Sequence, residues 1–70
     1  MMPLTMLGTG ETKRVLKING KDETRHFLEN LGFTLGTEVT VVSRLAGNMI
    51  VSIRDTRVAI DKSMANRIMV

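Results

Sequence analysis

The fold of this chain is decided by the stretch FLENLGFTLGTEVTVV, which runs from Phe27 to Val42. At its start Phe27, Leu28 and Leu31 recur at the spacing of one helix face. Gly32 comes next, and glycine most easily takes the left-handed conformation that ends a helix. Apolar and polar residues then alternate, which is typical of a strand. The stretch therefore predicts the end of a helix, a turn and the start of a strand.

A strand and a turn are predicted before the helix. Residues 11–18 alternate imperfectly, because Val15 and Leu16 are both apolar, but their β-branched side chains favour a strand. The dipeptide Asn19-Gly20 is a strong turn signal and ends this strand. We expect one continuous strand from Glu11 to Ile18.

The helix itself is predicted over residues 21–31. Asp22 is the expected N-cap, because its short carboxylate side chain can accept a hydrogen bond from the first turn. Arg25 and Glu29 are four residues apart and are expected to form a weak ion pair. Residues 1–10 predict one helical turn followed by a loop.

The second half of the chain predicts a run of short strands. Two alternating segments flank Ala46-Gly47-Asn48, and a short loop with glycine between such segments is typical of a hairpin. Val39, Val41, Ser43 and Leu45 are expected to share one face of the first segment. The predicted elements here are strands at residues 37–45, 49–54, 57–60 and 67–70, with one helical turn at residues 62–65 capped by Asp61.

These elements predict a mainly β fold in a single domain, residues 1–70. Short strands in so small a chain must curl to cover their inner face and protect their edges. We expect a small five-stranded SH3-like barrel. One short α-helix follows the first strand and plugs one opening, and a single helical turn precedes the last strand.

Composition argues against catalysis. The chain has 1 His and no Cys, Tyr or Trp, so the usual nucleophiles and general bases are almost absent. His26 and Asp22 are four residues apart on the helix, but a third metal ligand is not evident. We therefore predict no enzyme activity, no catalytic, cofactor-binding or metal-binding residues, and no cofactor.

The charge balance is mildly basic, with a formal net charge of +3 and no basic run. A solvated surface explains this pattern best. The alternative is a small nucleic-acid-binding β-barrel, although Phe27 and Phe33, the two aromatic residues, are better used inside the fold. Its candidate residues are Lys13, Arg14, Lys17, Arg44 and Arg54.

Nothing in the sequence predicts export or a membrane span. The segment from Met1 to Gly8 lacks the charged region and apolar run of a signal peptide. No segment approaches the roughly 18 apolar residues that cross a bilayer. Together with the absence of cysteine, these features predict a cytoplasmic protein.

With these elements in place, nearly the whole chain resembles the FeoA family of small bacterial proteins. The central piece and the last piece carry the most specific part of the resemblance. The matching residues are Leu4-x-x-Leu7-x-x-Gly10-Glu11, Val15-x-x-Ile18-x-Gly20, Arg25-x-x-Leu28-x-x-Leu31-Gly32-Phe33-x-x-Gly36-x-x-Val39-x-Val41, Val51-x-Ile53, Val58-Ala59-Ile60 and Ala65-x-x-Ile68-x-Val70.

The resemblance implies an SH3-like barrel that accompanies the ferrous iron transporter FeoB, a membrane protein with a cytosolic GTPase domain. Members of the family are cytosolic accessory proteins without enzymatic activity, and their pattern holds no catalytic or metal motif. One departure lies in the hairpin loop, where the family often has Gly-x-Pro and this chain has Gly47-Asn48-Met49.

The resulting hypothesis is an interaction module for ferrous iron uptake. It would dock on the GTPase-containing part of FeoB and reach the membrane only through that partner. Self-association stays open, and a direct iron chaperone is disfavoured because only His26 offers a nitrogen ligand. A core position is favoured for Leu28 and Phe33 taken singly. The candidate partner-binding residues are Arg25, Leu28, Phe33, Leu35 and Met49.

Overall fold

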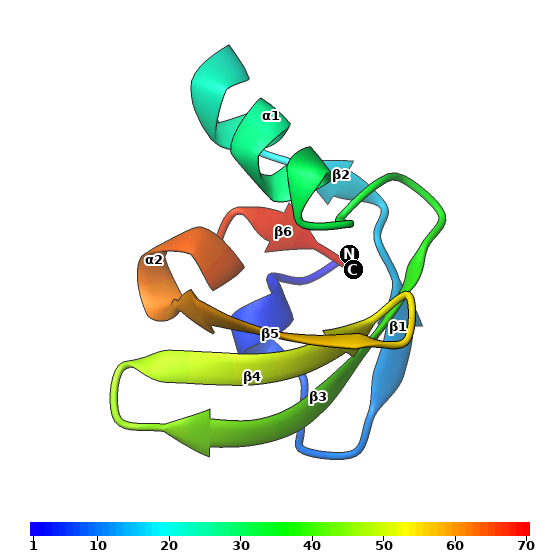
Figure 1. Ribbon diagram of the computed structural model, residues 1–70, viewed down its shortest axis with the longest axis vertical. Coiled ribbons are helices and arrows are strands. Elements are labelled where there is room, and N and C mark those ends of the chain that lie inside the picture. Colours follow the sequence, from blue (N-terminus) through cyan, green and yellow to red (C-terminus); the bar gives the residue numbers. More distant parts are fainter.

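Two antiparallel sheets form the fold in the computed structural model, which describes residues 1–70 (Figure 1). The larger sheet has the strand order β1-β3-β4-β5, and the smaller one pairs β2 with β6. The predicted mainly β fold with one short helix and one later helical turn is confirmed. The elements are η1 (Leu4–Met6), β1 (Thr12–Arg14), β2 (Lys17–Ile18), α1 (Asp22–Asn30), β3 (Glu38–Leu45), β4 (Asn48–Ile53), β5 (Thr56–Asp61), α2 (Lys62–Ala65) and β6 (Ile68–Met69).

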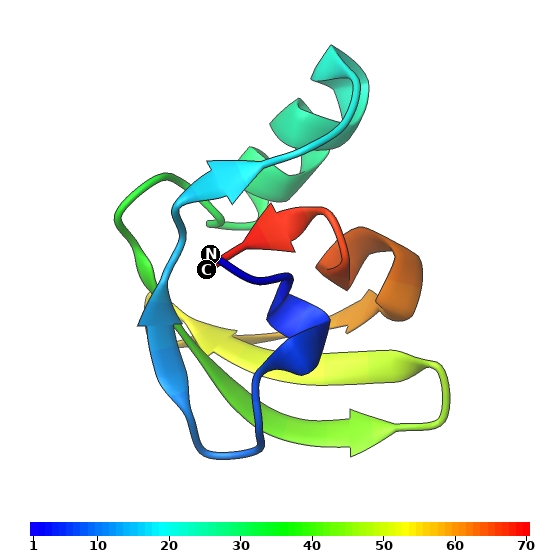
Figure 2. The same ribbon diagram turned by 180° about the vertical axis from the view of Figure 1, so that it is seen from behind.

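The first predicted strand is divided between the two sheets. β1 pairs with β3, whereas β2 pairs with β6, and the chain crosses from one sheet to the other at Val15 and Leu16 (Figure 2). The expectation of one continuous strand from Glu11 to Ile18 is therefore wrong. The two consecutive apolar residues that disturb the alternation mark this crossing.

α1 begins and ends almost where the sequence predicts. The N-cap is Lys21, not Asp22, and Asp22 lies in the first turn, where a carboxylate interacts favourably with the helix dipole. Gly32 follows the helix with φ +113°, and the Phe33 amide donates to the Leu28 carbonyl (3.0 Å). This left-handed turn sends Phe33 back into the barrel.

The face of α1 that packs on the barrel is narrower than predicted. Leu28 is fully buried and Leu31 is partly buried, but the Phe27 side chain is 50% exposed. Successive helix residues differ by about 100° in direction, so Phe27 lies on the flank of the face that Leu28 centres. The placement of Phe27 inside the fold was therefore wrong.

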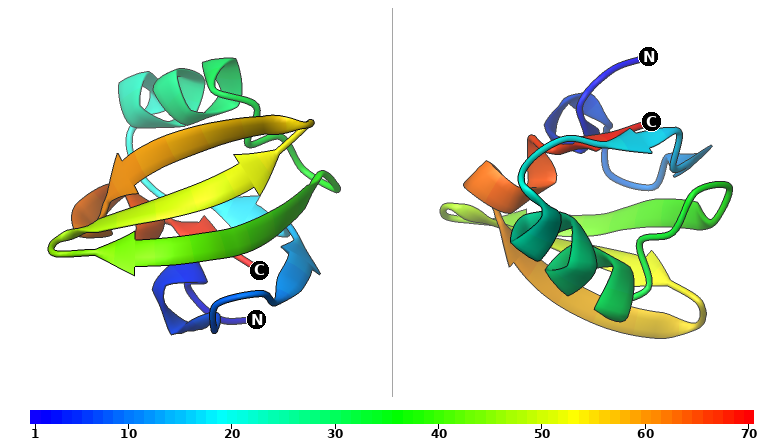
Figure 3. Two further views of the ribbon diagram at one scale, coloured as in Figure 1. Left: turned by 60° about the horizontal axis from the view of Figure 1, so that its bottom comes forward. Right: turned by 90° about the horizontal axis from the view of Figure 1, so that it is seen from above.

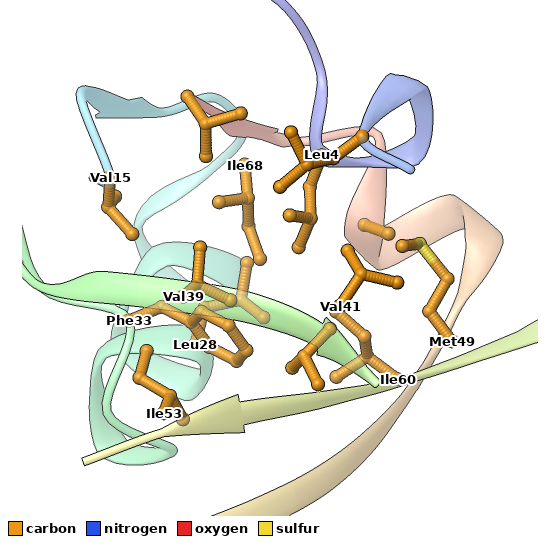
Figure 4. Close-up of a cluster of buried hydrophobic side chains, with 14 residues drawn as sticks. Leu4, Val15, Leu28, Phe33, Val39, Val41, Met49, Ile53, Ile60 and Ile68 are labelled. Atoms are coloured by element: carbon orange, nitrogen blue, oxygen red, sulfur yellow. The ribbon is translucent and has the colours of Figure 1, made fainter. Parts of the chain in front are cut away.

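The core lies between the two sheets and under α1 (Figure 4). Every buried residue is apolar, and no buried side-chain nitrogen or oxygen lacks a hydrogen-bond partner. The buried residues are Leu4, Leu7, Val15, Leu28, Phe33, Val39, Val41, Met49, Val51, Ile53, Ile60, Ala65, Ile68 and Val70.

A β-bulge reverses the side-chain pattern in the second half of β3. The register with β4 shifts between Val41 and Ser43, so Arg44 lies opposite the buried Met49 and Leu45 is exposed. The expected single face from Val39 to Leu45 is wrong, because an extra residue flips the alternation. The Arg44 guanidinium donates to the carbonyls of Thr5 and Leu7 and so ties η1 to the sheet.

Arg54, which was expected to end a strand, instead begins the turn between β4 and β5. Arg54 and Asp55 form a two-residue turn with φ values of +50° and +63°, as in a type I′ hairpin. Asp61 caps α2 as predicted, because its carboxylate accepts from the Met64 amide (2.8 Å).

The two ends of the chain lie together and form two backbone hydrogen bonds between Met2 and Val70 (Figure 1). None of the helices has the length and apolar character needed to span a bilayer.

Candidate docking groove

One groove on the surface brings together exposed apolar side chains from distant parts of the chain. It has a volume of about 280 Å³ and lies between β2, α1 and the loop after α1. Figure 2 shows β2 beside α1 at this side of the molecule. We call it the docking groove, and its lining residues are Leu16, Lys17, Ile18, Arg25, Glu29 and Leu35.

A tight turn holds Leu35 at the rim of this groove. The Thr37 amide donates to the Thr34 carbonyl (3.1 Å), and Gly36 has φ +85°, which the third residue of a type II turn requires. Leu35 therefore lies at the tip of the turn, where its side chain is 70% exposed. Two backbone bonds with Val15, at 2.9 and 2.8 Å, fix the turn against the crossing that precedes β2.

Leu16 is exposed because its neighbour is buried. Val15 points into the core, so the next residue along the extended chain points out, and the Leu16 side chain is 52% exposed. Its amide donates to the Met69 carbonyl (2.8 Å), which fixes its position beside β6. Leu16 and Leu35 thus both lie on backbone that is held by hydrogen bonds, and both line the docking groove.

α1 contributes the charged wall of the groove. Arg25 and Glu29 lie one turn apart on the flank of the helix, while Leu28 between them points into the barrel. The nearest acid to Arg25 is Asp22 (3.8 Å), not the predicted Glu29, and so exposed a pair contributes little to stability. With Lys17 on the opposite wall, the groove has apolar residues within a polar and charged rim, as docking surfaces commonly have.

The other two hollows lack this character. The largest one is lined only by polar and charged side chains, including a Thr12–Thr40 hydroxyl pair at 2.6 Å. The third hollow lies beside Arg44, whose guanidinium already donates hydrogen bonds to backbone carbonyls at η1. No group of three His, Asp or Glu side chains is close enough to hold a metal ion. The docking groove is therefore the strongest candidate site.

The structure separates the five predicted partner-binding residues into two groups. Arg25 and Leu35 both line the docking groove. Leu28, Phe33 and Met49 are buried in the core, the position favoured for Leu28 and Phe33 taken singly, so these three candidates do not lie on the surface. Leu28 is the centre of the packed helix face, Phe33 follows the Gly32 turn inward, and Met49 lies on the inner face of β4.

Four groove residues were missing from the sequence prediction. Leu16, Lys17 and Ile18 belong to the segment that was expected to be part of one regular strand, and Glu29 was assigned only to an ion pair. The available signal was the break in alternation at Val15. Two adjacent large apolar residues in a strand point to opposite sides, so one of them had to face away from the core.

The cations of the nucleic-acid alternative are largely used within the fold. Arg14 donates to the Gly36 carbonyl (3.3 Å), and Arg54 donates to the Thr34 hydroxyl (2.8 Å). Arg44 is held by the two carbonyls under η1. Three of the five candidate cations thus have internal partners, which weakens the case for a phosphate-binding surface.

One protein family matches almost the whole chain. The sequence profile described as the FeoA domain matches residues 2–70. The chain belongs to the FeoA family. No curated protein is similar to it at a significant level.

Solved FeoA structures share both the fold and part of the sequence. A crystal structure described as the iron uptake regulatory protein FeoA is 34% identical, with a TM-score of 0.90, and the match covers 97% of this chain and 90% of that one. FeoA from Stenotrophomonas maltophilia in complex with zinc is 28% identical, with a TM-score of 0.73 and coverage of 99% and 88%. It is described as a prokaryotic SH3 domain protein and is put forward there as an activating factor for bacterial ferrous iron transport. The predicted SH3-like fold is thus confirmed.

The same barrel also occurs within longer proteins. A manganese-dependent transcriptional repressor is 23% identical, with a TM-score of 0.86, and the match covers 94% of this chain but only 38% of the repressor. At this identity the likeness shows the fold alone.

Proposed function

We propose that this protein is a non-enzymatic accessory protein of ferrous iron uptake, which acts in the cytoplasm by docking on a FeoB-type transporter. The GTPase-containing part of that transporter is the expected contact, and docking would modulate its activity. Membership of the FeoA family supports the link to ferrous iron transport. The scarcity of catalytic side chains in this chain supports a binding role.

The observation that carries the proposal is that Leu16 and Leu35, both exposed, line the same docking groove. Burying exposed apolar area releases about 25 cal/mol per Å², so the two leucines can anchor a partner, and their hydrogen-bonded backbone needs little ordering on docking. Lys17 and Arg25 outnumber Glu29 in the groove, which favours a partner segment with apolar side chains next to carboxylates.

The test is a titration of isotope-labelled protein with the soluble GTPase domain of the cognate transporter, followed by backbone amide shifts. We expect the shifts to be localised at residues 16–18, on the flank of α1 and at the turn around Leu35. A parallel titration with a short RNA tests the alternative function, which is nucleic-acid binding. Shifts with RNA alone that weaken steeply with salt would contradict the proposal.

A matched pair of variants makes the test specific. Leu35 and Leu45 are 70% and 66% exposed, but only Leu35 lines the docking groove. Leu35→Asp is expected to abolish the shifts, whereas Leu45→Asp leaves them unchanged, and both variants keep the circular dichroism spectrum of the wild type. Equal binding by the two variants would show that docking does not use this groove.

A further inference from the structure

The outer edge of β5 is an unpaired strand edge. β5 pairs only with β4 and ends the four-stranded sheet, as Figure 3 shows. α1 closes the end of the barrel near this edge, but none of its backbone groups bonds to β5. With six residues, β5 is long enough to accept another strand.

The turn before β5 determines which of its backbone groups point outward. Ile53 and Thr56 flank a two-residue turn, so they form a hydrogen-bonded pair, and every second residue of β5 after Thr56 also bonds to β4. The backbone groups of Arg57 and Ala59, and the Asp61 amide, therefore point away from the sheet. These three side chains are exposed, whereas Val58 and Ile60 face the core side.

Among the residues of β5 whose backbone groups point away from the sheet, two with opposite charges flank the small Ala59. Arg57 and Asp61 are each two positions from Ala59. Arg57 has no ion pair or side-chain hydrogen bond within the chain. One oxygen of Asp61 caps α2, which leaves the other carboxylate oxygen free.

We propose that two copies of this chain pair through β5, antiparallel, with the two-fold axis at Ala59. In this register Ala59 bonds to the second copy of itself through both backbone groups. Each Arg57 then lies opposite Asp61 of the other copy, at the cross-strand distance where opposite charges stabilise a sheet. On the core side the same register places Val58 opposite Ile60, so apolar residues meet apolar residues.

The alternative two-fold registers are unfavourable. An axis at Val58 would place Arg57 opposite Ala59, and an axis at Ile60 would place Ala59 opposite Asp61, so neither of these registers pairs the two charges. An axis at Arg57 would place two guanidinium groups opposite each other, and an axis at Asp61 would do the same with two carboxylates, which destabilises such a pair. Charge complementarity therefore selects Ala59, where the side chain is also too small to obstruct the approach.

The test is self-association of the full chain measured by the rotational correlation time in solution. Interfaces below about 1,200 Å² form weak complexes, so the measurement covers concentrations up to about 2 mM. We expect the correlation time to rise toward twice the monomer value, with amide exchange slowed at Arg57 and Ala59 as the dimer forms. A wild-type protein that stays monomeric over this range would overturn the proposal.

Two substitutions test whether the β5 edge forms the contact between the two copies. Ala59→Pro removes an outward amide that no strand of the same copy uses, and Arg57→Glu replaces each attractive pair by a repulsive one. Both are expected to keep the monomer correlation time at all concentrations, while Arg57→Lys still associates. Lys13→Glu on β1 makes the same charge change at the opposite edge and is expected to associate like the wild type.

The folded state of each variant is checked by circular dichroism, and Arg57→Glu keeps the test decisive if Ala59→Pro does not fold. Unchanged association in Arg57→Glu would refute the β5 register. Association that Leu35→Asp abolishes and Arg57→Glu leaves intact would place the contact at the docking groove, and this too would refute it.

Discussion

Replacing Leu28 by alanine is expected to destabilise the protein far more than replacing its neighbour Phe27, although phenylalanine is the larger residue. Leu28 is fully buried at the centre of the packed helix face. Truncating a buried leucine leaves a cavity and costs about 2–5 kcal/mol. Phe27 is 50% exposed, and since full burial of such a side chain contributes about 1.5–3 kcal/mol, its loss costs about half of that.

The measurement is urea unfolding followed by far-ultraviolet circular dichroism, because the chain has no Trp or Tyr for fluorescence. A domain of this size has about 3–5 kcal/mol of stability, so Phe27→Ala remains folded while Leu28→Ala is largely unfolded in the absence of urea. Leu28→Met keeps the volume and should cost less than about 1.5 kcal/mol, which gives a measurable transition at the same position. Equal losses for the two alanine variants would mean that α1 presents a different face to the barrel.

Three further substitutions test the backbone of the fold. Ala46 has φ +53° in the hairpin turn, so Ala46→Gly removes a left-handed penalty of about 1–2 kcal/mol and adds an entropic cost of about 0.4–1 kcal/mol. The net stabilisation of about 0.5–1 kcal/mol should raise the melting temperature by about 2–8 °C. Gly32→Ala should cost about 1–3 kcal/mol in urea unfolding, because φ +113° is strained for any residue with a Cβ atom; an unchanged midpoint would refute this. Asp61→Ala should cost about 0.5–2 kcal/mol by losing the cap on the Met64 amide, whereas Asp61→Asn should restore most of that stability.

Local signals in the sequence were sufficient for most of the elements. The glycine after α1, the cap at Asp61 and the hairpin loop that contains Gly47 act through the conformation of one or two residues, so the residue type alone reveals them. The buried faces of β4 and β6 were also predictable, because alternation within one regular strand is a local property.

Features that depend on the pairing of distant segments were not predictable in the same way. The bulge in β3 exists because of its register with β4, and it exchanged the positions of Arg44 and Leu45 relative to the expected pattern. The crossing at Val15 likewise exists because β2 pairs with β6, at the far end of the chain. The docking groove combines β2, α1 and the Leu35 turn, so only Arg25 and Leu35 could be selected in advance.

The two proposed surfaces share no residue, and this has a consequence for how they would act together. The docking groove lies on β2, α1 and the Leu35 turn, whereas the self-pairing edge is β5. A dimer joined at β5 would carry two docking grooves, and two linked sites raise the effective concentration of the second contact once the first has formed. Ala59→Pro would then weaken binding to an oligomeric transporter while leaving the titration with a single GTPase domain unchanged. Leu35→Asp would abolish both kinds of binding and leave the dimer intact.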